Sequence, residues 1–240
     1  MLGRYNWFLD DPVAFPKEGP MGHIRIRKGK SKMWTWIGAV ALILLCLAAS
    51  SCVRVSEGTW FINEAKLPDG WPALTPVGQV QVKQYPVYRA AVVHEAELPT
   101  GGEQSMFRVL FRHIKDRQIA MTAPVEMGYV MPGREESSAK AQMVSMAFLY
   151  RQPTQGKNEA DGPIAVRNLP ARIYASIGVR GGYTEDRFIS QLKALDVWLD
   201  EQGSVWKPNG PPRYLGYNSP FIPSFMRYGE VQLPVEKVKN

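Results

Sequence analysis

The sequence predicts an α+β fold in which duplicated β-β-α-β-β units form a distorted antiparallel β-barrel flanked by two helices. Segments with the alternating apolar residues of strands occur in two groups of four, and each group surrounds one amphipathic helix. A glycine pair precedes each helix, at Gly101-Gly102 and again 80 residues later at Gly181-Gly182. Each unit has one helix to cover its strands, so the two units must share a core.

The first unit follows the order strand, strand, helix, strand, strand. Val80–Tyr85 and Val87–Val93 alternate as two strands. Apolar residues then recur with the spacing of one helix face from Met106 to Ile114. Ile119–Tyr129 alternates again, and Met143–Tyr150 is the fourth expected strand.

The second unit repeats this order. Thr184 is the expected N-cap of its helix, because a threonine side chain can accept a hydrogen bond from the first turn. The expected elements are strands at Ile164–Arg167 and Ala171–Val179, a helix with its apolar face from Phe188 to Leu199, and strands at Arg213–Tyr217 and Met226–Leu233.

The net charge of +7 comes mostly from the N-terminal part of the chain. Residues 1–33 carry seven Lys or Arg and three acids, residues 34–51 carry no charge, and from Cys52 onward 22 basic residues face 19 acidic ones. A basic stretch followed by an apolar stretch is typical of an export signal or a membrane anchor. No basic stripe interleaved with aromatic residues follows, so we expect no nucleic-acid partner.

The end of the apolar stretch, Ala48-Ala49-Ser50-Ser51-Cys52, resembles the lipobox of bacterial lipoproteins. This resemblance implies cleavage before Cys52 and lipidation of its thiol. An uncleaved transmembrane helix is an alternative, since 18 residues reach about 27 Å and a hydrocarbon core measures about 30 Å. A cleaved, soluble product is a third alternative. All three place the folded domain in the cell envelope, facing the periplasm or the exterior.

The predicted organisation has three parts. Residues 1–51 form an N-terminal extension with the signal or membrane segment, residues 52–77 a linker, and residues 78–237 the folded domain. Met21 is the expected true start, because it directly precedes the basic run. The two cysteines, Cys46 and Cys52, lie in or beside the apolar stretch, so the folded domain has no internal disulfide and no cysteine metal site.

Three motifs resemble the SOUL / haem-binding protein family. Ile119–Val125 reads I-A-M-T-A-P-V, residues 211–223 are similar to the A-R-Y-x-x-P-x-x-P segment, and Met226–Val231 is similar to the R-R-N-E-V strand. The resemblance covers residues 78–235. It implies a barrel like that of gyrase-inhibitor-type proteins, reversible binding of haem or another tetrapyrrole in a shallow apolar cleft beside the first helix, and no shared catalytic constellation.

The candidate site is expected around the first helix. Haem iron takes His, Met, Cys or Tyr as its axial ligand, so His113 or His94 is the candidate metal ligand. Methionines suit a pliable apolar pocket, and arginines pair with propionates. A solvated helix position for His113, and core packing for the methionines, are the alternatives. The expected ligand-binding residues are Met106, Leu110, Arg112, His113, Arg117, Met121 and Met127.

The sequence therefore favours an exported, membrane-anchored protein that binds haem or a similar flat apolar molecule and is not an enzyme. It contains no G-x-S-x-G motif and no triad or metal cluster. A small hydrolase on the same fold is an alternative, which an acid within hydrogen-bond reach of His94 or His113 in a cleft would favour. An envelope interaction module without a small ligand is another, which a filled cleft would favour.

Overall fold

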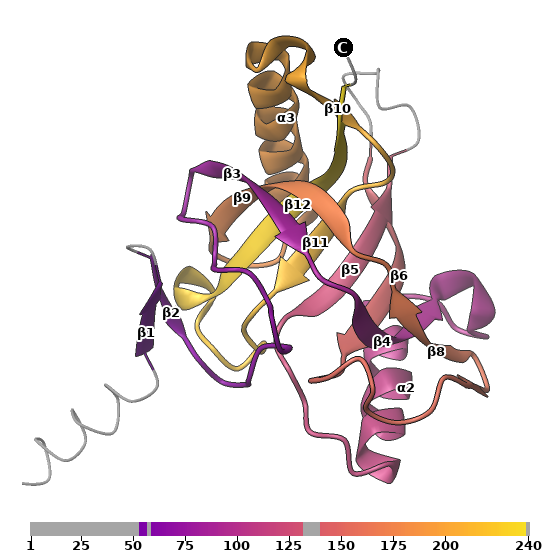
Figure 1. The fold of residues 1–240 in the computed structure, drawn as a ribbon. Helices are drawn as coiled ribbons and strands as arrows, with labels where there is room; N and C mark the ends of the chain where they lie inside the picture. The colour runs from indigo at the N-terminus through magenta and orange to yellow at the C-terminus, as the bar shows by residue number, and fades with distance from the viewer. Residues whose placement is uncertain (1–52, 57–58, 132–139, 239–240) are drawn as a thin grey trace, which may run out of the picture. The chain divides into compact units, whose positions relative to one another are not determined.

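The computed structural model describes residues 53–56, 59–131 and 140–238, and it shows a large antiparallel sheet with two helices (Figure 1). The predicted N-terminal extension, the apolar stretch and Cys52 lie outside these residues. No helix in the described ranges is long and apolar enough to cross a membrane. The elements are β1 (Val53–Ser56), β2 (Thr59–Ile62), β3 (Val80–Tyr85), β4 (Tyr88–His94), η1 (Glu95–Glu97), α2 (Glu103–Asp116), β5 (Val125–Val130), β6 (Gln142–Leu149), β7 (Ala160–Asp161), β8 (Ile164–Leu169), β9 (Arg172–Arg180), α3 (Glu185–Glu201), η2 (Gly203–Val205), β10 (Trp206–Pro208), β11 (Arg213–Gly216), η3 (Ser224–Met226) and β12 (Tyr228–Lys237).

The two units occupy the two halves of the large sheet and exchange one strand each. The strand order is β3-β9-β12-β11-β5-β6-β4-β8-β7, with β10 added to β12. The order β4-β6-β5 in the first unit matches β9-β12-β11 in the second, and β5 pairs with β11 between them. The first strand of each unit pairs into the other half, β3 with β9 and β8 with β4.

The distorted barrel expected from the sequence is not formed, because the sheet remains open. On this strand path β3 has one neighbour, β9, and the opposite end stops at the two-residue β7 beside β8. Within the residues that the structure covers, no ladder joins these ends. A barrel needs its first and last strands to pair, but here β7 occupies the outer side of β8.

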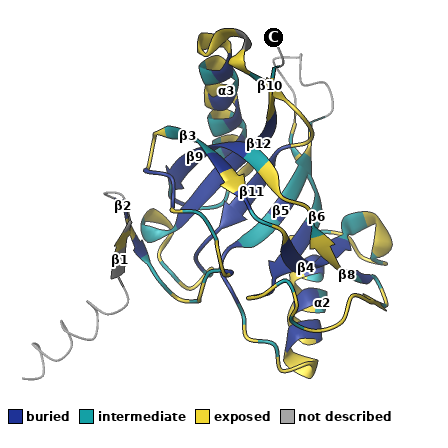
Figure 2. Cartoon of the chain, viewed as in Figure 1, coloured by how far each residue is buried: buried dark blue, intermediate teal, exposed yellow. Residues whose placement is uncertain are grey.

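Both helices cover the same face of the sheet and fill one core. α2 contributes Met106, Leu110 and Ile114, and α3 contributes Phe188 and Leu192, to a single cluster with the inward side chains of the strands. Figure 2 shows the central strands buried, while the ends of the helices and the outer loops are exposed. The shared core that the sequence predicted is therefore confirmed.

The two helix starts agree with the sequence. α2 begins after Gly102, which has φ 99°, a backbone conformation that glycine adopts without steric cost. α3 begins after Thr184, whose side chain accepts a hydrogen bond from the Arg187 N–H at 3.4 Å. The glycine break and the threonine cap were thus assigned correctly.

The strand predicted for Ile119–Tyr129 begins later than expected, at Val125. Pro124 has no N–H to donate to a ladder. The N–H of Ala123 donates instead to the Lys66 carbonyl at 3.1 Å, and Thr122 bridges to Lys66. The first six residues of the I-A-M-T-A-P-V run therefore lie outside β5, and Thr122 and Ala123 are bound to the segment that precedes β3.

The face of the sheet opposite the helices holds a buried polar cluster centred on Glu230, which is fully buried. Lys83 of β3 lies 2.9 Å from both carboxylate oxygens of Glu230. The other donors to this carboxylate are the Thr75 N–H, Tyr85, Ser176, Tyr228 and Gln232. The buried charges of Lys83 and Glu230 thus compensate each other, and hydrogen bonds satisfy the rest of the carboxylate.

Arg213 of β11 extends the cluster toward the first unit. Its guanidinium donates to Gln232 at 2.9 Å, to the Tyr88 hydroxyl at 2.7 Å and to Glu126 at 2.9 Å. It also lies 3.7 Å from the centroid of the Tyr174 ring. The cluster therefore connects β12 of the second unit with β4 and β5 of the first.

Part of the segment expected as a linker covers this polar face. Trp71 packs edge-on against Tyr85 and Tyr88, with ring centroids 4.7 and 5.3 Å away. Leu74 and Thr75 are buried, at 1% and 0% exposure. These residues exclude water from the Glu230 cluster, which strengthens the electrostatic interactions inside it.

Lys83→Met should lower the free energy of unfolding by about 3–5 kcal/mol, because it leaves the buried Glu230 carboxylate without its cation. Urea denaturation of the full chain in mild detergent, followed by tryptophan fluorescence, measures the loss. Lys207→Met is the matched control, since the Lys207–Glu236 pair is also 2.9 Å apart but exposed, and it should cost at most about 1 kcal/mol. Equal losses would contradict the prediction.

Glu230→Gln should change the acid dependence of stability. Burial raises the pKa of Glu230, but the Lys83 charge and the hydrogen bonds from Lys83, Thr75 and Tyr228 outweigh it and hold the pKa below its usual value. A depressed folded-state pKa adds stability that is present above the unfolded pKa of about 4.3 and is lost as the pH falls through the folded value.

The difference in unfolding free energy between the wild type and Glu230→Gln should therefore stay constant from neutral pH to about pH 5 and shrink below about pH 4. Urea denaturation at a series of pH values measures it. Other carboxylates titrate equally in both proteins and cancel in the difference. A difference that is independent of pH would show that the pKa of Glu230 is the same in the folded and unfolded chains, and would contradict the prediction.

Candidate functional site

The inner face of α2 lies in the core. Met106 and Leu110 are fully buried, and Met127 of β5 is 3% exposed. Met121, in the loop before β5, is half-buried against the same cluster. Four of the expected ligand contacts thus pack in or against the core, as the alternative for the methionines had it, and they hold α2 on the sheet.

His113 is buried on α2, and both of its ring nitrogens have partners. Nδ1 lies 2.7 Å from Oδ2 of Asp161, and Nε2 lies 2.8 Å from the hydroxyl of Tyr150. A solvated position for His113 was therefore a wrong expectation, since the residue is 3% exposed. A ring nitrogen ligates iron through a free lone pair, so His113 would first have to lose one of these hydrogen bonds.

Two of the predicted arginines differ in their surroundings. Arg117, just after α2, pairs with Asp161 at 2.8 Å and lies 3.6 Å from Glu159. The hydrogen bond with His113, followed by the charge of Arg117, holds the pKa of Asp161 below its usual range. Arg112 is exposed on the outer side of α2. Arg117 thus belongs to the His113–Asp161 contact, whereas Arg112 faces water.

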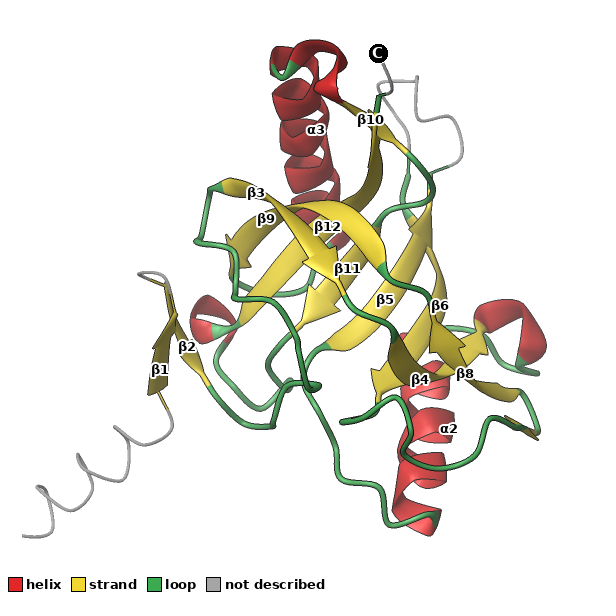
Figure 3. Ribbon diagram, viewed as in Figure 1, coloured by secondary structure: helices red, strands yellow, loops and turns green. Residues whose placement is uncertain are grey.

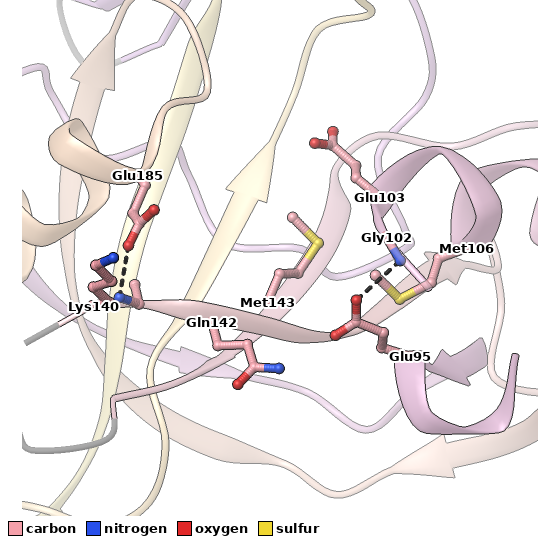
Figure 4. Close-up of a pocket in the computed structure, with 9 residues that line it drawn as sticks. Glu95, Gly102, Glu103, Met106, Lys140, Gln142, Met143 and Glu185 are labelled. Carbon is pink, nitrogen blue, oxygen red and sulfur yellow. Dashed lines mark hydrogen bonds between the residues drawn. The ribbon is translucent and has the colours of Figure 1, made fainter. Parts of the chain in front are cut away.

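A cleft of about 470 Å³ opens at the first turn of α2 (Figure 4). Its walls come from the turn before α2, the start of β6 and the start of α3, and the size is typical of small-ligand sites. Met106 reaches it with part of its side chain, so one of the predicted contacts borders a hollow. The charged and methionine side chains that line it are Glu95, Glu103, Met106, Lys140, Met143 and Glu185.

The rim of this cleft is acidic. Glu95 accepts a hydrogen bond from the Gly102 N–H at 3.0 Å, and Glu185 accepts one from the Ala141 N–H at 3.0 Å (Figure 4). Burial, followed by the charges of Glu103 and Glu185, raises the pKa of the neighbouring Tyr129. Three carboxylates against the single ammonium of Lys140 disfavour anionic groups at this point.

An aromatic row, formed by Phe107 and Phe111, runs along α2 away from the cleft. The two rings stack with centroids 6.0 Å apart and an angle of 11° between their planes, and they are 37% and 47% exposed. Phe107 also packs edge-on against the buried Phe148 at 5.1 Å. Because residues four apart lie on one side of a helix, the row continues the line of Glu103, which borders the cleft.

Reasoning from the sequence placed Phe107 and Phe111 on the apolar helix face but did not identify them as an exposed row. Consecutive helix residues are rotated by about 100°, and Met106 and Leu110 already fill the core. A second pair of large apolar residues, also four apart, is the signal that could have identified an exposed row. Arg108 and Arg112 are exposed beside it with the same spacing.

His94 lies nearer to the cleft in the chain than His113 does. It ends β4, directly before the cleft residue Glu95, and is half-buried. Its backbone N–H donates to Glu97 at 3.4 Å. In the described part of the chain, no group of three or more His, Cys, Asp or Glu could hold a free metal ion.

Solved structures with a similar arrangement have low sequence identity to this chain. An uncharacterized conserved protein from Listeria innocua matches with 12% identity and a TM-score of 0.50, over 67% of this chain and 94% of that one. The C-terminal domain of EcmrR matches with 18% identity and a TM-score of 0.47, over 67% and 98%. A hydrolase from Listeria innocua matches with 12% identity and a TM-score of 0.49, over 67% and 93%. At 12% identity the first likeness concerns the fold alone.

No curated relative matches the chain. The family model of the SOUL heme-binding protein matches residues 73–234, about two thirds of the sequence. The matched range contains both units of the sheet, the cleft and the aromatic row. It also carries the motifs around Ile119–Val125 and Met226–Val231, so the resemblance drawn from them is confirmed. The chain belongs to the SOUL heme-binding protein family.

Proposed function

We propose that this chain is an exported, membrane-tethered protein that binds haem or a related tetrapyrrole and catalyses no reaction. Family membership supports a tetrapyrrole ligand. The aromatic row is the observation that carries the binding proposal, because Phe107 and Phe111 present two stacked and exposed rings on one helix. A flat macrocycle buries its apolar surface on such a ledge.

Arg108 and Arg112 are suited to the carboxylates of the ligand. Both are exposed on α2, one residue after each phenylalanine, and a guanidinium can bind a carboxylate with two hydrogen bonds. The acidic rim of the cleft disfavours propionates at the other end of the row. Charge therefore supports one orientation of the ligand, with its propionates toward the arginines.

His94 is a better candidate for the axial ligand than His113. The ring nitrogens of His113 are both engaged with Asp161 and Tyr150. His94 is half-buried at the end of β4, and the next residue, Glu95, lines the cleft from which the aromatic row runs. A bound haem would supply the iron, and a histidine in this position would supply one coordinating nitrogen.

The acid–histidine pair in this chain supports a structural role better than hydrolysis. Asp161 lies within hydrogen-bond reach of His113, as a hydrolase would require. The third group is the Tyr150 hydroxyl, which belongs to a side chain that is 1% exposed, and burial raises its pKa. A buried phenol that keeps its proton is a poor nucleophile. We therefore infer that this chain of hydrogen bonds fastens α2 to the end of β6 and to β7.

The order of the N-terminal sequence supports the tether. A basic run precedes 18 uncharged residues, and Cys52 follows them directly. Positive charge before an apolar stretch keeps that end in the cytoplasm and sends the following domain across the membrane. A lipid on Cys52 and an uncleaved helix both lead to the same placement of the domain, on the outer side of a membrane.

Replacing both Phe107 and Phe111 with Ala should weaken hemin binding by roughly tenfold or more, because the loss of two aromatic contacts removes on the order of 1.5 kcal/mol. Titration of the full chain in detergent, with the Soret shift as readout, measures the dissociation constant. The control replaces Phe221 and Phe225, two exposed phenylalanines outside α2, and should bind like the wild type. A wild-type chain without a saturable shift would overturn the proposed function.

His94→Ala should alter the Soret band of the bound hemin, since it removes the proposed coordinating nitrogen. His113→Ala should leave the band in place and instead lower the free energy of unfolding, because it removes the contacts to Asp161 and Tyr150. Absorbance spectra and urea denaturation distinguish the two effects. The reverse pattern, with the band altered by His113→Ala alone, would assign the iron to His113.

A further inference from the structure

The hairpin of β1 and β2 has one face toward the domain and one face toward the outside. Thr59 and Phe61 are buried, at 5% and 4% exposure. Val55 and Trp60 stand opposite each other in the register and are 72% and 41% exposed. Alternate residues of a strand point to opposite faces. The hairpin therefore turns an apolar pair away from the domain.

The loop between β11 and β12 lies beside this hairpin, and Arg180 of β9 joins the two. Its guanidinium lies 3.8 Å from the centroid of the Trp60 ring and donates to the Trp60 carbonyl. The same guanidinium donates to the Met226 carbonyl at 3.0 Å. Asn218 donates to the Ile62 carbonyl at 2.7 Å. Figure 1 shows the turn of this loop next to β2.

This loop exposes two phenylalanines. Phe221 is 94% exposed and Phe225 is 72% exposed. Arg227 holds the loop, because its guanidinium donates to the Ile222 carbonyl at 2.7 Å and to the Pro220 carbonyl at 2.6 Å. A group of exposed apolar residues on two neighbouring, hydrogen-bonded segments is typical of a surface that contacts an apolar partner.

We propose that Val55, Trp60, Phe221 and Phe225 (the anchor face) insert into the interfacial layer of the lipid bilayer that holds the N-terminal segment. This inference rests on the membrane tether proposed above. Tryptophan is enriched at the membrane–water interface, and phenylalanine partitions into the boundary of the acyl chains. Arg180 holds Trp60 in this position by stacking on its ring and donating to its carbonyl.

The chain between the proposed tether and the hairpin is very short, and this supports contact of the anchor face with the membrane. Val53 pairs with Ile62 in the hairpin, and Cys52 is the residue bonded to Val53. Consecutive Cα atoms are about 3.8 Å apart, so a lipid on Cys52, or a helix that ends at Ser51, is attached one or two residues from the docked hairpin. A domain on so short a connection keeps this surface at the headgroups.

Photocrosslinking of the full chain in its own membranes tests the anchor face. The residue p-benzoylphenylalanine replaces Phe221 or Phe225, and in the matched controls it replaces Phe107 or Phe111, which are also exposed phenylalanines. Mass spectrometry measures covalent adducts to phospholipid after irradiation. We expect roughly tenfold more lipid adduct at 221 and 225 than at 107 and 111, because an interfacial side chain lies about 5–10 Å deep among the lipids.

The possible results distinguish a failure of the anchor-face proposal from a failure of the tether proposal. If membrane-bound protein gave the same amount of lipid adduct at 221 and 225 as at 107 and 111, the anchor face would be overturned and the tether would remain. Adducts to protein at 221 and 225 would overturn it in favour of a protein partner. A chain that does not sediment with membranes would overturn both proposals.

A variant with p-benzoylphenylalanine in place of Trp60 tests the anchor face independently, in case a substitution at 221 or 225 disturbs the loop. Trp60 lies on the hairpin and not on the loop, so lipid adducts should form there at the level found for 221 and 225. Adducts at Trp60 no more abundant than at 107 and 111 would overturn the proposal. Urea denaturation of each labelled protein verifies that it has folded.

Discussion

The buried ion pair between Lys83 and Glu230 is the interaction on which the exchanged arrangement of strands depends. Lys83 lies on β3, the first strand of the first unit, and Glu230 lies on β12 of the second, with β9 between them. Two charges removed from water are stable where they meet each other and the surrounding donors. The Thr75 N–H binds the same carboxylate, so one side chain fixes the exchanged strand, its register and the segment that covers it.

Local patterns in the sequence were sufficient for most of the elements but not for their pairing. Val80–Tyr85 was located to the residue because alternation is a property of the strand itself. The exchange of β3 and β8, and the open sheet, depend on contacts between distant segments that no short pattern encodes. Charged residues at alternate positions of an antiparallel sheet commonly face water, so local pattern gives no sign that Lys83 and Glu230 are buried. They are buried because the segment around Trp71 and Leu74 covers that face.

The candidate site shows the same division between local and distant determinants. The sequence predicted a site around α2, and the structure has a cleft at the first turn of this helix. The role of His113 was not predictable from α2, because its partners Tyr150 and Asp161 are 37 and 48 residues away in the chain. The separation of Met106, inside, from Phe107, outside, depends on how the sheet meets the helix. A one-residue difference in the sequence thus distinguishes a core side chain from an exposed one.

The exchange of first strands has a consequence for how the two units assemble. A lone unit would keep β4, β5 and β6 together but would leave the outer edge of β4 without the strand that now comes from the other unit. An unpaired edge of this kind recruits a strand from a second molecule. A lone unit could therefore complete this edge only with a strand from another chain. With both units in one chain, this pairing is an intramolecular step that does not depend on protein concentration.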